Sequence, residues 1–144
     1  MAIQRRKTRT CVVGGLKIGG GFPVRIQTMT MGKTENVKKC VAEIKTVERD
    51  ADLIRVAIPN FEAAKSIAEI KSKIKMPLVA DIHFDPRLAI AALDYGADKI
   101  RINPGNFFDK NYLDKVIELA KKKNAAIRIG VNAGSLEKDI WAKH

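Results

Sequence analysis

The stretch LVADIHFDPRLAIAALDYGADKIRI, residues 78–102, contains one strand–helix–strand unit. The apolar run at 78–82 has the length and branched side chains of a buried strand. Asp85, followed by proline, is a typical N-cap, and Gly96 is typical of a helix end. A second short apolar run follows at 99–102. This order of elements predicts a pair of parallel strands joined by a crossover helix.

The same pattern repeats along most of the chain, because segments with helical spacing of apolar residues alternate with short strand-like runs. The predicted strands lie at 24–28, 53–58, 78–82, 99–102 and 126–131. Five such units predict the α/β class, either as an open doubly wound sheet or as an incomplete TIM (β/α)8 barrel. We expect a short β-hairpin in residues 1–22 and the partial barrel in residues 23–144.

Composition narrows the class of protein. The chain has 144 residues and a formal net charge of +11, which raises a polyanion as a partner. Many of the lysines fall on predicted helix faces, where a solvated basic surface explains them equally well. Cys11 and Cys40 form neither a CxxC pair nor a zinc pattern, so we expect a reducing, cytoplasmic location. No apolar run is long enough to cross a bilayer, so no membrane partner is expected.

Three predicted strands each contain an arginine, namely Arg55, Arg101 and Arg128. A buried guanidinium needs a partner, because burying an unpaired charge is costly. At the carboxyl ends of barrel strands it can instead point into a wet pocket, where TIM barrels place their active sites. Arginine pairs bidentately with phosphate oxygens, so three of them predict a polyanion site. Asp81 and His83 share one face of their strand, which adds them to this site.

Other candidate sites are weaker. The segment 32–34, Gly-Lys-Thr, resembles the end of a P-loop, but Gln27 stands where that motif needs glycine. Asp81, His83 and Asp85 could be read as metal ligands, yet Asp85 is better used as a helix cap and two ligands are too few. We therefore predict no metal site in this chain. Arg25 begins its strand and should lie at the opposite end of the barrel.

Long segments of the chain resemble the hydroxymethylbutenyl diphosphate synthases, the GcpE family. The opening segment is GG at 19–20 with PVRIQTMT at 23–30. The others are LVADIHFD at 78–85, KIRINPGN at 99–106 and IRIGVNAGSLE at 127–137. The resemblance runs from Arg5 to the end of the chain, and several long motifs in the same order are highly specific.

The resemblance implies a TIM barrel followed by a smaller domain that holds a [4Fe-4S] cluster. Members of the family are oxidoreductases that reductively convert methylerythritol cyclodiphosphate into hydroxymethylbutenyl diphosphate in non-mevalonate isoprenoid biosynthesis, the methylerythritol phosphate pathway. The implied partners are the cyclic diphosphate, a flavodoxin or ferredoxin as electron donor, and a second subunit in a homodimer. The implied cluster ligands, three cysteines and a glutamate, belong to a C-terminal domain that this sequence does not contain.

The resemblance also implies roles for individual residues. The three strand arginines would hold the diphosphate, and His83 would contact the substrate beside Asp81. Asn103 and Asn132 would supply amide hydrogen bonds. Cys11 and Cys40 match none of the cluster ligands, and Met31 stands where the family more often has asparagine, which puts a role for that loop in doubt. An unclosed barrel leaves strand edges and apolar surface exposed, so we expect the chain by itself to be marginally stable, prone to associate, and inactive.

Two other functions stay open at this point. The first is a phosphate-binding TIM-barrel enzyme with different, pterin-type chemistry, which would need an amide-rich pocket rather than three arginines. The second is a basic module that binds nucleic acid without catalysis. Such a module needs exposed aromatic residues among the basic ones, and aromatic residues make up only 6% of this chain, so nucleic acid is the less favoured partner.

Overall fold

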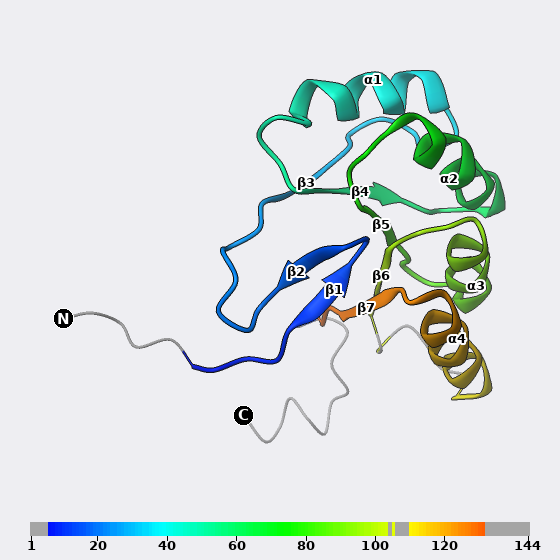
Figure 1. Ribbon diagram of the computed structural model, residues 1–144. Helices are drawn as coiled ribbons and strands as arrows, with labels where there is room; N and C mark the ends of the chain where they lie inside the picture. The colour runs from blue at the N-terminus through cyan, green and yellow to red at the C-terminus, as the bar shows by residue number, and fades with distance from the viewer. Residues whose placement is uncertain (1–5, 104, 106–109, 132–144) are drawn as a thin grey trace.

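A computed structural model describes residues 6–103, 105 and 110–131 of the chain. It contains a five-stranded parallel sheet in the sequential order β3-β4-β5-β6-β7, and its four helices lie together on one face of that sheet (Figure 1). The strands are β3 (Gln27–Met29), β4 (Leu53–Ala57), β5 (Leu78–Asp81), β6 (Lys99–Ile102) and β7 (Ala126–Ile129). The helices are α1 (Val37–Val47), α2 (Phe61–Lys73), α3 (Pro86–Asp94) and α4 (Lys110–Lys123).

This order of strands decides between the two predicted architectures. A doubly wound sheet reverses its strand order at a switch point and carries helices on both faces. Here the order never reverses and the helices cover the outer face alone (Figure 1). The predicted TIM-barrel fold class is therefore confirmed, with the barrel unclosed over the described residues.

The hydrophobic core lies between the sheet and its helices. Side chains alternate along each strand, so one set packs outward against the helices and the next set faces the concave side. The outward set includes Ile54, Val56, Leu78, Ile82 and Ile100, all of which are nearly or completely buried. The opposite set carries Arg55, Asp81, Arg101 and Arg128, so the alternation separates the core from these predicted site residues.

A β-hairpin occupies the concave side of the sheet, opposite the helices (Figure 1). It consists of β1 (Cys11–Val13) and β2 (Leu16–Ile18), which pair antiparallel as the sequence predicts. A Cβ atom added to Gly14 in its turn would lie 2.9 Å from Asp98 and 3.0 Å from Pro77. Both contacts precede strands, so the hairpin turn packs at the N-terminal end of the sheet.

The first barrel strand begins later than predicted, at Gln27 rather than at residue 24. Ile26 donates its backbone N–H to the Asp52 carboxylate, at 2.7 Å, in place of a ladder hydrogen bond. Val24 and Ile26 are 70% and 58% exposed. The Asp52 side chain thus holds residues 24–26 in place of strand pairing, and the apolar periodicity of a strand does not predict such a contact.

The ends of α3 follow their predicted caps, and an asparagine caps α2. The Asp85 carboxylate accepts a hydrogen bond from Arg87 N at 2.9 Å at the start of α3, and Gly96 has a φ of 96° directly after its end. Asn60 caps α2 by accepting from Ala63 N at 2.8 Å. Over the described ranges, no helix combines the length and hydrophobicity needed to cross a membrane.

Candidate functional site

The carboxyl half of the sheet brings four of the predicted residues onto one concave face. Strand register aligns Asp81 with Arg101, and Arg101 with Arg128, in one row across β5, β6 and β7. Arg55 lies one row lower, opposite Val79. Residues on the same row or two apart along a strand share a face, so these side chains converge.

Asp81 is the centre of the cluster. Its side chain is only 4% exposed. Its Oδ2 atom lies 3.6 Å from Arg55 Nε and 3.7 Å from His83 Nε2, and its Oδ1 atom lies 3.5 Å from Arg101 Nη1. A carboxylate this deeply buried requires such partners. The shared face predicted for Asp81 and His83 is thus observed.

Arg101 is held tightly against the neighbouring strand. Its side chain is 15% exposed, and its Nη2 atom donates to the Gly130 carbonyl at 3.4 Å. A Cβ atom at Gly130 would lie only 2.7 Å from Arg101 Nε. A side chain at this position would therefore displace the guanidinium from its observed place. We did not single out Gly130 from the sequence, although a glycine within a strand pattern often marks such a close approach.

Arg55 contacts a second residue that the sequence analysis did not select. Its Nε and Nη2 atoms lie 3.1 Å and 3.0 Å from the Met29 sulfur. Met29 is the register partner of Arg55 on the adjacent strand. An apolar residue in a strand gives no sequence signal for such a role, because packing explains it equally well.

Positive charge exceeds negative charge in this cluster. Lys99 lies two residues before Arg101 on the same face of β6, and burial lowers its pKa, with further lowering by the charges of Arg128 and Arg55. Arg128 is exposed, and in the described part of the chain it forms no ion pair. Arg55 and Arg101 contact the Asp81 carboxylate, and Lys99 and Arg128 add two more positive charges to the same face, an arrangement suited to a polyanion.

The two predicted asparagines are not seen to contact the arginine cluster in the described part of the chain. Asn103 is 3% exposed and its Oδ1 atom accepts from Gly105 N at 3.1 Å, so its carbonyl oxygen organises its own loop. Asn132 lies outside the described residues. His83 is half-exposed beside Asp81.

The opposite end of the sheet is built from internal ion pairs. Arg25 Nη1 lies 3.3 Å from Asp52 Oδ1, before β4, so its predicted position away from the site is confirmed. Lys71 pairs with Asp98, whose carboxylate also accepts from Leu78 N at 2.7 Å. These contacts fix the N-terminal ends of the strands and leave the arginine cluster as the charged concave surface.

The P-loop-like segment is also used internally. Thr34 donates its hydroxyl to the Ala57 carbonyl at 2.6 Å. The backbone N–H groups of Met31 and Gly32 donate to the Glu43 carboxylate, at 2.6 Å and 3.2 Å. A carboxylate already occupies the amides that a phosphate would need, which agrees with the rejection of this motif from the sequence.

Comparison with known proteins identifies the family to which the chain belongs. The GcpE TIM-barrel domain matches residues 8–144. The chain belongs to the GcpE family. A 4-hydroxy-3-methylbut-2-en-1-yl diphosphate synthase (flavodoxin) of Caldanaerobacter subterraneus subsp. tengcongensis is 53% identical over 145 residues, which cover 100% of this chain and 41% of that protein. The synthase of the same name from Klebsiella pneumoniae is 48% identical, with 99% and 38% covered. This GcpE chain thus spans about two fifths of the length of these relatives.

Among solved structures, the Xanthomonas albilineans dihydropteroate synthase is similar in fold to this GcpE chain. The two superpose with a TM-score of 0.57 at 20% identity, over 78% of this chain and 49% of that one. This likeness supports the TIM-barrel architecture alone. The family match rules against the pterin-type alternative, because the sequence agreement is with the diphosphate synthases.

The cysteines of the described part do not suit the cluster that the family resemblance implies. Cys11 is exposed on the hairpin, whereas Cys40 is buried in α1. Burial, followed by the Glu43 charge, raises the Cys40 pKa to about 11. Metal-ligating thiols must be deprotonated. No group of three or more His, Cys, Asp or Glu side chains in the described ranges could hold a metal ion.

Proposed function

We propose that this GcpE chain forms the substrate-binding barrel portion of a 4-hydroxy-3-methylbut-2-en-1-yl diphosphate synthase, with methylerythritol cyclodiphosphate as the substrate. The observation that carries the proposal is the excess of positive charge on the concave face, where Arg55 and Arg101 contact one buried carboxylate and Arg128 lies beside Arg101. The names of the curated relatives support the reaction, and the name flavodoxin in them supports that electron donor.

In this proposal the residues act by binding and positioning. Arg101 and Arg128 lie side by side in register and take the diphosphate oxygens, while Arg55 approaches from the row below.

Asp81 is too buried to be the main contact with an anion, and we assign it to holding the arginines and His83 in place. His83 contacts the substrate, and Asn103 and Asn132 add amide hydrogen bonds. Such preorganised charges bind without rearrangement.

The reduction belongs to a [4Fe-4S] cluster that would be held by residues outside those described here. A flavodoxin, or a ferredoxin in its place, would supply the electrons, and a homodimer is the proposed active assembly. We place the enzyme in the cytosol, which the free thiols of Cys11 and Cys40 support. The 144-residue chain on its own is expected to bind the diphosphate without turning it over.

Calorimetric titration of the chain with inorganic pyrophosphate tests this binding role. Arg101→Gln should weaken binding by about tenfold to a hundredfold, because charge-assisted hydrogen bonds to the anion are lost. Arg25→Gln is the matched control, since it removes the same charge from the far end of the sheet, and it should change the affinity by roughly twofold or less. The comparison separates a specific site from general attraction to a basic protein.

Two results would overturn the proposal. One is an equal loss of affinity in both variants, which would indicate binding by net charge alone. The other is tighter binding of a single-stranded oligonucleotide than of pyrophosphate, with a steep salt dependence, which would favour the nucleic-acid module instead.

A further inference from the structure

The partner of Arg55 on β3 is a thioether rather than an acid. Two nitrogen atoms of its guanidinium, Nε and Nη2, lie 3.1 Å and 3.0 Å from Met29 Sδ. The Asp81 carboxylate is farther away, at 3.6 Å. The Arg55 side chain is still 28% exposed, toward the concave side. The sulfur is thus the nearer of the two groups that fix the direction of this guanidinium.

A thioether orients a cation without neutralising it. Its sulfur is a weak, uncharged acceptor, so it can align the N–H groups of Arg55 but cannot cancel their charge. Among the described residues, the carboxylate that pairs with Arg55 is Asp81, which is shared with Arg101 and His83. Most of the positive charge of Arg55 therefore stays available for an anionic ligand. A carboxylate in place of the sulfur would hold the guanidinium equally well but would consume its charge.

The register of β3 and β4 places the Met29 and Arg55 side chains next to each other. Met29 and Arg55 are Cα partners on the adjacent parallel strands β3 and β4. The Thr30 N–H donates to the Arg55 carbonyl at 3.0 Å, which continues the pairing immediately beyond Met29. The two side chains are therefore held on the same face by backbone hydrogen bonds.

We propose that Met29 is a positioning residue for ligand binding, which sets the direction of Arg55 while leaving its charge free for a diphosphate. This inference rests on the proposed function for the identity of the anion. It assigns a role in binding to a residue whose apolar character otherwise suggests core packing alone.

Three substitutions at one position separate orientation, volume and charge. Met29→Leu keeps the apolar volume and removes the acceptor, so pyrophosphate affinity should fall by about fivefold, the effect of one hydrogen bond. Met29→Gln restores an uncharged acceptor and should bind within about twofold of the wild type. Met29→Glu supplies an acceptor with a charge, and it should weaken binding by roughly tenfold or more. Met31→Leu, at a side chain 92% exposed on the same segment, is the matched control and should leave the affinity unchanged.

A second measurement without ligand keeps this test separate from the proposed function. The Nε–Hε NMR signal of Arg55, identified by its loss in Arg55→Lys, reports the order of the guanidinium. The order parameter should drop in Met29→Leu and recover in Met29→Gln. If the wild type fails to bind pyrophosphate, the proposed function falls, whereas this signal still decides whether Met29 orders Arg55. An unchanged order parameter in Met29→Leu, or equal loss of affinity in the Leu and Gln variants, would overturn the inference.

Discussion

At the scale of single residues, the site carries more positive than negative charge. Asp81 supplies one buried negative charge to Arg55, Arg101 and His83, and no second acid joins them among the described contacts. Such a cluster is costly without an anion, because like charges are held close in a partly desolvated space. Binding energy is therefore available to a ligand that completes the charge balance.

Lys99 gives this imbalance a measurable pH dependence. Its pKa is lowered in the folded chain, first by burial and then by the charges of Arg128 and Arg55. The unfolded chain then binds this proton more tightly than the folded chain does. The free energy of unfolding should therefore rise as the pH increases from the lowered pKa of Lys99 to the usual value of 10.5. Lys99→Met should raise the free energy of unfolding at neutral pH and remove this rise. Urea denaturation across the pH range measures both effects, and parallel pH profiles for the two proteins would contradict the prediction.

The sequence identified the charged members of the site but not the residues that hold them. Arginines inside strands conflict with a buried environment, and that conflict made Arg55, Arg101 and Arg128 visible. Met29 satisfies every local rule for a strand, so nothing in the sequence distinguishes it, and the glycine at 130 signals a close approach without indicating which residue approaches. Their roles depend on which residue lies opposite them in the neighbouring strand, a register that only the folded sheet fixes.

At the scale of elements, the helices were predictable wherever a local cap defines them. The Asp85–Pro86 start and the Gly96 end of α3 need only neighbouring residues, and both are observed. The buried face of α2 was less well predicted. Apolar spacing in the sequence predicts a buried stripe that includes Phe61 and Ala68, but both are exposed, and the helix instead buries Ala63, Ala64, Ile67 and Ile70. The angle at which a helix meets the sheet selects its buried face, and apolar spacing alone leaves two neighbouring faces open.

The cap of α3 can be tested by mutation. Asp85→Ala should lower the free energy of unfolding by about 1 kcal/mol, because the Arg87 N–H loses its acceptor. The pKa of Asp85 is lowered, mainly by its hydrogen bond with the Arg87 side chain, so this stability is present above the usual value of 3.8 and is lost as the pH falls below it. Asp94→Ala, at the other end of the same helix, is the control and should change stability by less than about 0.5 kcal/mol. Equal effects of both variants at neutral pH, measured in urea, would argue against the cap.

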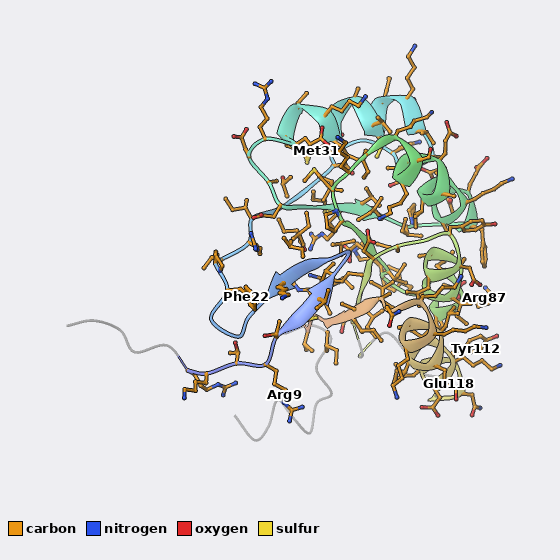
Figure 2. The ribbon with its side chains drawn as sticks, viewed as in Figure 1. Arg9, Phe22, Met31, Arg87, Tyr112 and Glu118 are labelled. Atoms are coloured by element: carbon orange, nitrogen blue, oxygen red, sulfur yellow. The ribbon has the colours of Figure 1, made fainter. Side chains whose placement is uncertain are left out.

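At the scale of the whole molecule, the sheet has two free edges over the described residues, at β3 and β7. Ile129 on β7 is 67% exposed and Val131 beyond it is 48% exposed. Figure 2 shows Arg87, Tyr112 and Glu118 on the outer helical layer. Unpaired strands with apolar side chains are templates for association. The predicted tendency of this chain to associate therefore has a defined structural location.

Sedimentation velocity of the 144-residue chain over a range of concentrations tests this tendency. The average mass should rise with concentration, and Ile129→Lys should shift the rise to higher concentration, because a charge on an edge strand opposes pairing. Lys122→Gln on the exposed surface of α4 is the control and should have no such effect. A monomer at every concentration would contradict the prediction.

The hairpin on the concave side has a consequence for how the chain folds during synthesis. Its turn at Gly14 packs against Pro77 and Asp98, and β1 contacts β7. The hairpin is therefore synthesised before the sheet residues that it contacts, which are among the last of the described strands. On the ribosome, the hairpin has no surface to dock on until β5 and β6 have emerged. Loop closure over so many residues is slow, so the N-terminal segment waits exposed while the outer layer of helices assembles ahead of it.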